Sequence, residues 1–135
     1  MCIRDRKTID ELQERLISGG STGRVDVLKL NVEVIAVDDL NLDPTFIKID
    51  TEQHEHDALL GLEKTVNKSR PIFMLESGGA QDQACRDWLR ARNYRRYVYN
   101  HEKNILWQTE TAALNAFFVP DEKVVQVRKS GVSFV

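Results

Sequence analysis

Cysteine is scarce in this 135-residue sequence, which contains only Cys2 and Cys85. The two lie far apart and form no Cys-x-x-Cys pair, so the sequence offers neither a disulfide framework nor a zinc site. Chains without disulfides are typical of reducing compartments, and we therefore expect a cytoplasmic protein. Residues 1–6 lack the apolar core of a signal peptide and resemble a read-through scar, so they are left out of the fold prediction.

Long apolar runs and an excess of one charge are also absent. No stretch approaches the roughly 20 apolar residues that cross a bilayer, and we expect no membrane partner. Nineteen basic residues stand against 21 acidic ones, which gives a net charge of −2 and argues against nucleic-acid binding. One local cluster of arginines is interpreted as the solvated side of a helix. It comprises Arg86, Arg90, Arg92, Arg95 and Arg96.

The composition, with 41% hydrophobic and 30% charged residues, is that of one small folded domain or a piece of a larger one. Thr8 and Glu11 fit a capping box, and the apolar spacing after them predicts a helix over residues 9–17. A glycine-rich run then ends the helix. A phosphate-binding glycine-rich loop follows a strand and precedes a helix, whereas this run follows a predicted helix and precedes a predicted strand. Two β-rich segments come next, over 25–30 and 32–37.

The centre of the chain alternates between strand and helix patterns. We predict them at residues 46–50, 51–66, 72–76 and 84–93. This order favours right-handed crossovers and a parallel sheet.

The last third of the chain is rich in β pattern. Strand-like runs are found at 94–99, 105–108 and 114–119, which suggests an antiparallel edge on the sheet. Residues 121–135 predict an extended tail.

Acidic residues follow two of the central strands. In open α/β sheets, ligands bind beyond the carboxyl ends of the strands, which singles out residues 50–55 and 76–78, with Asp50 and Glu76 as the two acids at neighbouring strand ends. Such a pair of strand ends could abstract a proton or hold a polar ligand. An equally simple interpretation is that Asp50 caps the following helix and that Glu52 and Glu55 favour its positive end.

The His54-Glu55-His56 run invites a metal interpretation. Residues two apart do not share a helix face, and the HExxH spacing of zinc proteases is absent. We therefore predict no metal site. A metal-dependent hydrolase that uses Asp50, Glu52 and His56 stays open as a minor alternative.

The central block resembles the FkbM-type S-adenosylmethionine-dependent methyltransferases. The run FIKIDTEQHE, residues 46–55, is similar to the family motif F-I-K-I-D-x-E-G-x-E. Further segments match in the same order: VEVIAVDDL (32–40), ALLGL (58–62), RPIFMLE (70–76), WLRARNY (88–94) and NAFFVP (115–120). The resemblance therefore spans about residues 32–120.

Three departures from the family pattern stand out. Gln53 takes the place of a glycine that lets backbone and ligand approach closely. The glycine-rich cofactor loop of the family and the acid that holds the cofactor ribose have no counterpart before Val32. Residues 7–31 do not follow the family order, and Val25–Leu30 faintly echoes the later strand motif.

The resemblance implies a partial Rossmann-like methyltransferase fold of the α/β class. The sheet should be mostly parallel, with an antiparallel C-terminal edge. We divide the chain into an N-terminal segment, 1–31, the C-terminal part of a methyltransferase domain, 32–120, and a tail, 121–135. The origin of the first segment stays open between an artefact, a spliced piece and coincidence.

The same resemblance implies methyl transfer from S-adenosylmethionine, with O-methylation of a small-molecule or saccharide hydroxyl. It assigns catalysis to His54, Asp50 and Glu52, with His54 as the preferred base because its pKa lies nearest neutrality. Glu55 and Glu76 would bind substrate, and Asp50 would also contact the cofactor.

An alternative is a non-catalytic, truncated α/β module that needs a partner chain. In either case a shortened sheet exposes a strand edge and an apolar face, and such surfaces tend to associate. We therefore expect a fragment that associates with itself through this edge and binds no nucleic acid.

Overall fold

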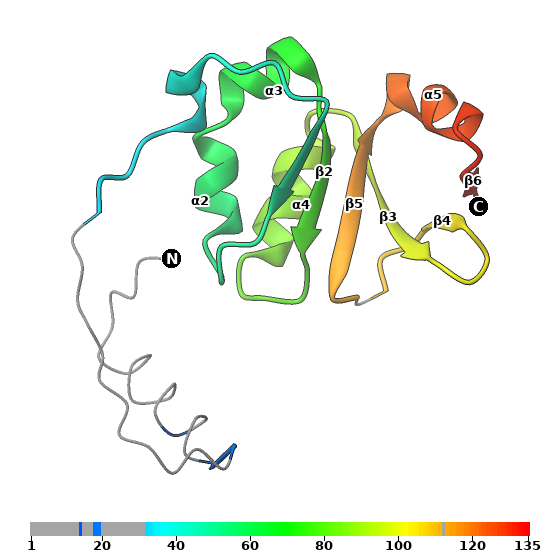
Figure 1. Ribbon diagram of the computed structural model, residues 1–135, viewed down its shortest axis with the longest axis horizontal. Helices are drawn as coiled ribbons and strands as arrows, with labels where there is room; N and C mark the ends of the chain where they lie inside the picture. Colours follow the sequence, from blue (N-terminus) through cyan, green and yellow to red (C-terminus); the bar gives the residue numbers. More distant parts are fainter. Residues whose placement is uncertain (1–13, 15–17, 20–31, 112) are drawn as a thin grey trace. The chain divides into compact units, whose positions relative to one another are not determined.

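The computed structural model describes Glu14, Ser18, Gly19 and residues 32–111 and 113–135 (Figure 1). The chain divides into two compact units, Met1–Val34 and Ile35–Val135, and all the described strands belong to the second. The predicted helix, glycine-rich stop and first strand, all upstream of residue 32, lie outside the described residues apart from the three named above.

Six strands form one open sheet (Figure 1). They are Phe46–Ile49 (β1), Ile72–Glu76 (β2), Tyr94–Asn100 (β3), Ile105–Gln108 (β4), Asn115–Pro120 (β5) and Ser133–Phe134 (β6). Their order is β1-β2-β5-β3-β4-β6. β1 and β2 are parallel, β5 lies between β2 and β3 and is antiparallel to both, and β4 is antiparallel to β3. The predicted α/β class is confirmed, with parallel and antiparallel strands in one sheet. The sheet is not mostly parallel as expected, because three of the five pairings among the described strands are antiparallel and β5 lies inside the sheet.

Short helices connect the strands. They are Val37–Leu40 (η1), Glu55–Leu60 (α2), Glu63–Ser69 (α3), Asp82–Arg90 (α4), Asp121–Lys123 (η2) and Val124–Lys129 (α5), where η denotes a 3₁₀ helix. Within the described residues, none of these is long or apolar enough to cross a bilayer.

The single helix predicted over 51–66 is wrong, because the chain breaks it into α2 and α3 at Gly61 and Leu62. Gly61 packs closely on Ala36, where a Cβ would lie 3.5 Å from the Ala36 Cα. Its carbonyl accepts a hydrogen bond from the Asp38 N–H at 3.0 Å. The segment before β1 is therefore docked on the break, and no local pattern in the helix reveals this contact.

Asp38 also caps the second helix. Its carboxylate accepts the N–H groups of Lys64 and Thr65 at 2.9 and 2.8 Å and the Thr65 hydroxyl at 2.8 Å. Burial of Asp38 opposes its charge, yet these hydrogen bonds outweigh it and lower the pKa of the carboxyl below its usual value. The side chain thereby satisfies donors at the start of α3 that have no partner within the helix.

Two further predictions are corrected. The β-rich run 32–37 is not a strand, since residues 32–36 are irregular and the 3₁₀ helix η1 begins at Val37. The tail 121–135 is not extended, because it forms η2, α5 and β6. Its valines Val124 and Val127 pack against the sheet with Phe134, so tertiary contacts decide its conformation.

The two faces of the sheet carry separate apolar clusters. Phe73 and Phe118 lie opposite each other in register and pack with Leu59, Val66 and Leu89 from the helices α2, α3 and α4. The neighbouring residues in β2 and β5 point the other way, because side chains alternate along a strand. On that face Ile72, Phe117 and Val119 pack with α5 and β6.

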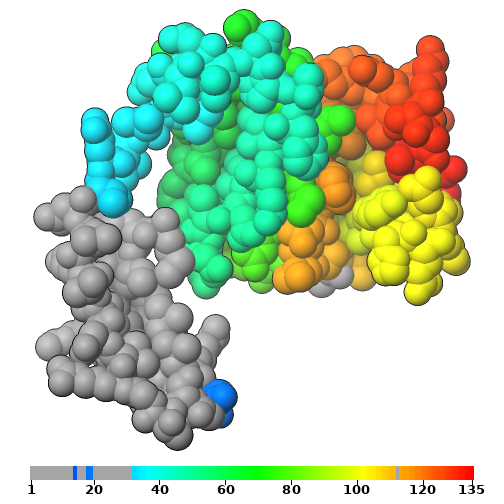
Figure 2. Space-filling view, viewed as in Figure 1, coloured from blue at the N-terminus to red at the C-terminus, as the bar shows by residue number. Residues whose placement is uncertain are grey.

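The described residues cover the second face only in part. An apolar cavity of about 230 Å³ remains there, and Phe46, at its border, is 48% exposed. In the described part of the chain, β1 pairs only with β2 and so forms one edge of the sheet. Figure 2 shows the segment around β1, coloured teal, at the molecular surface.

Candidate functional site

Three carboxylates converge at the carboxyl ends of β1 and β2. Ile49 lies opposite Leu75 in the parallel register, so Asp50 and Glu76 follow side by side. Each of Asp50, Glu52 and Glu76 offers an oxygen that lies within 4.8 Å of the other two. The structure thus brings together Asp50 and Glu76, the two strand-end acids expected to be neighbours, and adds Glu52 from the loop that follows β1.

The two strand-end carboxyls differ in their affinity for a proton. Lys48 donates a hydrogen bond of 2.6 Å to Asp50, and this bond with its charge lowers the pKa of the Asp50 carboxyl. The ion pairs among the described residues do not include Glu76. Burial, and then the negative charges of Glu52 and Asp50, raise the pKa of Glu76 above its usual value. The pair therefore favours a proton on Glu76 and an ionised Asp50.

A left-handed turn positions Glu52. Glu52 and Gln53 have φ angles of 51° and 74°, a region that residues other than glycine rarely adopt. The buried carboxylate of Glu55 holds the turn, because its Oε1 accepts the N–H groups of Thr51 and Gln53, each at 3.1 Å, and the Thr51 hydroxyl at 3.2 Å. Glu55 thus points under the loop and is not part of the group of three acids.

The positive φ of Gln53 explains why this position favours glycine. The Gln53 side chain lies against the loop after β2, where a Cβ on Gly79 would be 3.7 Å from the Gln53 Cγ. The side chain therefore occupies space beside the two strand ends that a glycine would leave open.

His54 lies at the exposed start of α2. Its Nδ1 is 3.0 Å from Asp57 Oδ2, and its side chain is 54% exposed. Hydrogen bonds from His54 and Gln81 lower the pKa of the Asp57 carboxyl. The backbone N–H of His56 donates to Gln81 Oε1 at 2.9 Å, which ties this loop to the start of α4. Neither histidine belongs to the acidic group.

Sequence reasoning missed three residues of this region. Lys48 was a detectable partner of Asp50, because side chains two apart lie on the same face of a strand. Asp57 could have been found as the i+3 neighbour of His54 in a first helical turn. Gln81 comes from another element, and no local spacing predicts its contact.

The chemistry of the three acids suits two kinds of ligand. Carboxylate oxygens are the ligands that hard divalent cations such as Mg²⁺ and Ca²⁺ prefer. They also accept hydrogen bonds from hydroxyl groups and stabilise a nearby positive charge. Of the two strand-end carboxyls, Asp50 releases its proton more readily than Glu76 does.

Comparison with known families gives one match, to the family described as the methyltransferase FkbM domain. It covers residues 6–96 and therefore includes all three acids, the loop after β1 and His54. Searches of the curated proteins and of the solved structures found no significant match.

Proposed function

The chain belongs to the methyltransferase FkbM domain family, and we propose that it transfers a methyl group from S-adenosylmethionine to a hydroxyl of a small-molecule or saccharide acceptor. The observation that carries the proposal is the convergence of Asp50, Glu52 and Glu76 at the ends of two parallel strands. In open α/β sheets this is the place where ligands bind.

The acidic group fits the charge of the cofactor. When bound, S-adenosylmethionine supplies an electrophilic methyl group on a positively charged sulfur. Asp50, whose lowered pKa keeps it ionised, contributes negative charge to such a ligand. Asp50 would contact the cofactor.

His54 is the proposed general base. A hydroxyl acceptor must lose its proton during the transfer, and a side chain within reach accelerates this step. If Asp57 accepts a hydrogen bond from Nδ1–H of His54, the other ring nitrogen, Nε2, is left to take the proton. Asp57 is then a positioning residue that fixes the tautomer.

Glu76 and Glu55 have different parts in the proposal. Glu76 would accept a hydrogen bond from a hydroxyl of the acceptor, and Glu52 would accept one beside it. The Glu55 carboxylate is occupied by hydrogen bonds from the N–H groups of Thr51 and Gln53. Glu55 would therefore affect substrate binding only indirectly, through the loop that it holds. It would fix Glu52 in place and contact no ligand directly.

Binding of the cofactor is the first test. We expect calorimetry with the whole 135-residue chain to give a measurable heat for S-adenosylmethionine. Asp50→Asn should raise the dissociation constant at least about tenfold, because it removes a negative charge from the site. Asp39→Asn removes the same charge from an exposed position in η1 and serves as the matched control. No binding by the unaltered chain, or an equal loss in both variants, would contradict the proposal.

Turnover tests the assignment of the base. With an accepted hydroxyl substrate, His54→Gln should lower kcat about 100-fold or more, as expected for loss of a general base. His56→Gln is the control, since His56 contacts Gln81 through its backbone N–H, which the substitution leaves in place. Unchanged release of S-adenosylhomocysteine by the His54 variant would end this assignment.

A further inference from the structure

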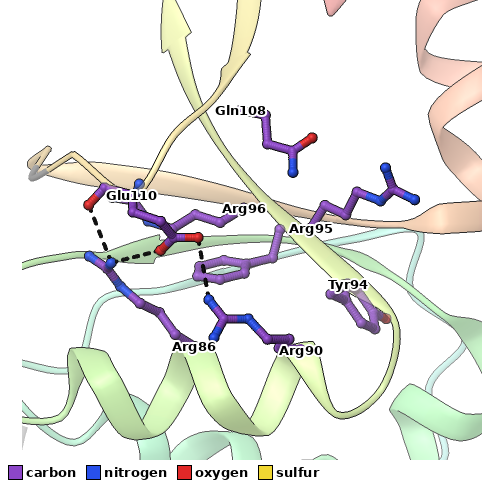
Figure 3. A pocket seen from close by; sticks show the side chains of 8 residues that line it. Arg86, Arg90, Tyr94, Arg95, Arg96, Gln108 and Glu110 are labelled. Carbon is purple, nitrogen blue, oxygen red and sulfur yellow. Dashed lines mark hydrogen bonds and ion pairs between the residues drawn. The ribbon is translucent and has the colours of Figure 1, made fainter. Parts of the chain in front are cut away.

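A second cluster of charged side chains lies between α4, β3 and the segment that follows β4 (Figure 3). It surrounds a cavity of about 150 Å³ that is separate from the three acids. Four arginines and a single carboxylate line it. The lining residues are Arg86, Arg90, Arg95, Arg96, Glu110, Gln108, Tyr94 and Phe118.

Arg96 is a buried cation without an anionic hydrogen-bond partner. It is 5% exposed. Its guanidinium donates to the carbonyl oxygens of Thr109 and Thr111 and, at 3.3 Å, to the Ser77 hydroxyl. All three acceptors are neutral. Burial, and then the charge of Arg86, lower the pKa of Arg96, and the carboxylates of Asp82 and Glu110 offset this only in part.

Arg86 lies on the facing side of α4 and also has unused donor capacity. Its Nη2 donates to Asp82 at 2.6 Å and its Nη1 to Glu110 at 3.0 Å. Its Nε–H is buried without a partner, and so is the Nε–H of Arg96. Among the described residues only one other buried side-chain atom is in this state, the hydroxyl of Tyr94, which also lines the cavity. A buried donor without an acceptor is costly, which points to a ligand that supplies acceptors.

Glu110 partly occupies the position of an anion. Its carboxylate accepts hydrogen bonds from Arg86 and from Arg90, the latter at 3.3 Å, as Figure 3 shows. The side chain is nevertheless 62% exposed, so it can turn towards solvent at little cost. An incoming anion would compete with it for the two guanidinium groups.

We infer that this cavity binds a small oxyanion of the phosphate class, held by the guanidinium groups of Arg86 and Arg96 with Arg90 at its border. Arginine binds phosphate with charge-assisted hydrogen bonds, and the arginines that line the cavity supply the donors. Free phosphate and a phosphoryl group on a larger molecule share this chemistry. The small volume favours the free ion or the end of a phosphomonoester.

Arginine side-chain NMR tests the inference directly. In the ¹⁵N-labelled full chain, titration with inorganic phosphate at constant ionic strength should shift the Nε–H signals of Arg86 and Arg96 with a common dissociation constant of about 1 mM. Glycerol phosphate as a second probe distinguishes a phosphomonoester from the free ion by tighter binding. Acetate should bind at least about tenfold more weakly. No saturable shift, or an equal response to chloride, would overturn the inference.

Two variants and a control separate this site from general ionic effects. Arg86→Lys keeps the charge but removes the Nε–H donor, and should weaken phosphate binding at least about tenfold. Glu110→Gln removes the competing carboxylate and should tighten it about threefold. Arg92→Lys alters a nearby arginine that pairs with Glu63 and does not line the cavity, and should leave the binding unchanged. Equal weakening in both lysine variants would refute a defined site.

Discussion

Gln53 has a backbone conformation that costs free energy for any residue with a Cβ. Its φ of 74° and the 51° of Glu52 make two consecutive left-handed residues in the loop between β1 and α2. The buried Glu55 carboxylate stabilises this loop with hydrogen bonds to its backbone. The backbone strain therefore lies in the loop that places Glu52 beside the ends of β1 and β2.

Gln53→Gly should stabilise the protein by about 1 kcal/mol, because relief of the strained φ exceeds the added entropy of the unfolded chain. Urea denaturation followed by circular dichroism measures the change. Gln83→Gly is the matched control, since it places the same substitution in α4, where glycine should destabilise by about 1 kcal/mol. Destabilisation by both variants would refute strain at Gln53.

Glu76 makes stability depend on pH in a defined direction. Its pKa is raised in the folded protein, so the folded state holds the proton more tightly than the unfolded state does. Stability from this group is complete below the unfolded pKa and falls as pH rises through the folded pKa. Glu76→Gln should therefore be more stable than the unaltered chain at pH 7, and the difference should disappear towards pH 4.

Thermal unfolding at a series of pH values measures this difference. Glu102→Gln removes a negative charge from an exposed turn and controls for net charge. If the benefit of Glu76→Gln were the same at every pH, the raised pKa could not be its cause.

Among the elements, α3 depends on a cap from another part of the chain. Asp38 in η1 accepts two N–H groups from the first turn of α3, which has no cap of its own at Leu62. Asp38→Ala should cost about 1 to 2 kcal/mol of unfolding free energy. Asp39→Ala, at the exposed neighbouring position, should change it by less than about 0.5 kcal/mol, measured by urea denaturation. Equal effects would contradict the capping role.

The elements that sequence could predict are those whose pattern is decided locally. β1 and β2 are short apolar runs that end in acids, and the parallel pairing followed from the strand–helix–strand order. The break at Gly61 depends on Ala36, and the fold of the tail depends on the sheet face beneath Val124 and Val127. Such contacts leave no periodic signal in the sequence.

The residues of the candidate site also fall into those that the sequence pattern predicts and those that depend on tertiary structure. Asp50 and Glu76 were predicted as neighbours because parallel strands end at one edge of the sheet. The direction of Glu55 could not be predicted, since it follows from two left-handed residues that hydrophobic spacing does not reveal. The burial of Arg96 could not be predicted either. The sequence does not show which acceptors its guanidinium reaches, and without them an arginine is interpreted as solvated.

At the scale of the whole molecule, β1 forms a sheet edge beside an incompletely covered apolar face. We expect the protein to associate with itself through this edge, so that sedimentation velocity shows a larger species as concentration rises. Phe46→Lys places a charge at the border of that face and should favour the monomer. Trp107→Lys removes an equally exposed aromatic from β4 and should not. Monomers at all concentrations would contradict this expectation.

The position of β5 determines when the protein can fold during synthesis. Asn115–Pro120 separates β2 from β3, although both of those strands leave the ribosome earlier. Until β5 emerges, the nascent chain has no strand with which to join its two halves, and Phe73 lacks its partner Phe118. Translation that pauses shortly before residue 115 would therefore expose apolar surface that chaperones bind, and the sheet would close only after residue 120 has left the ribosome.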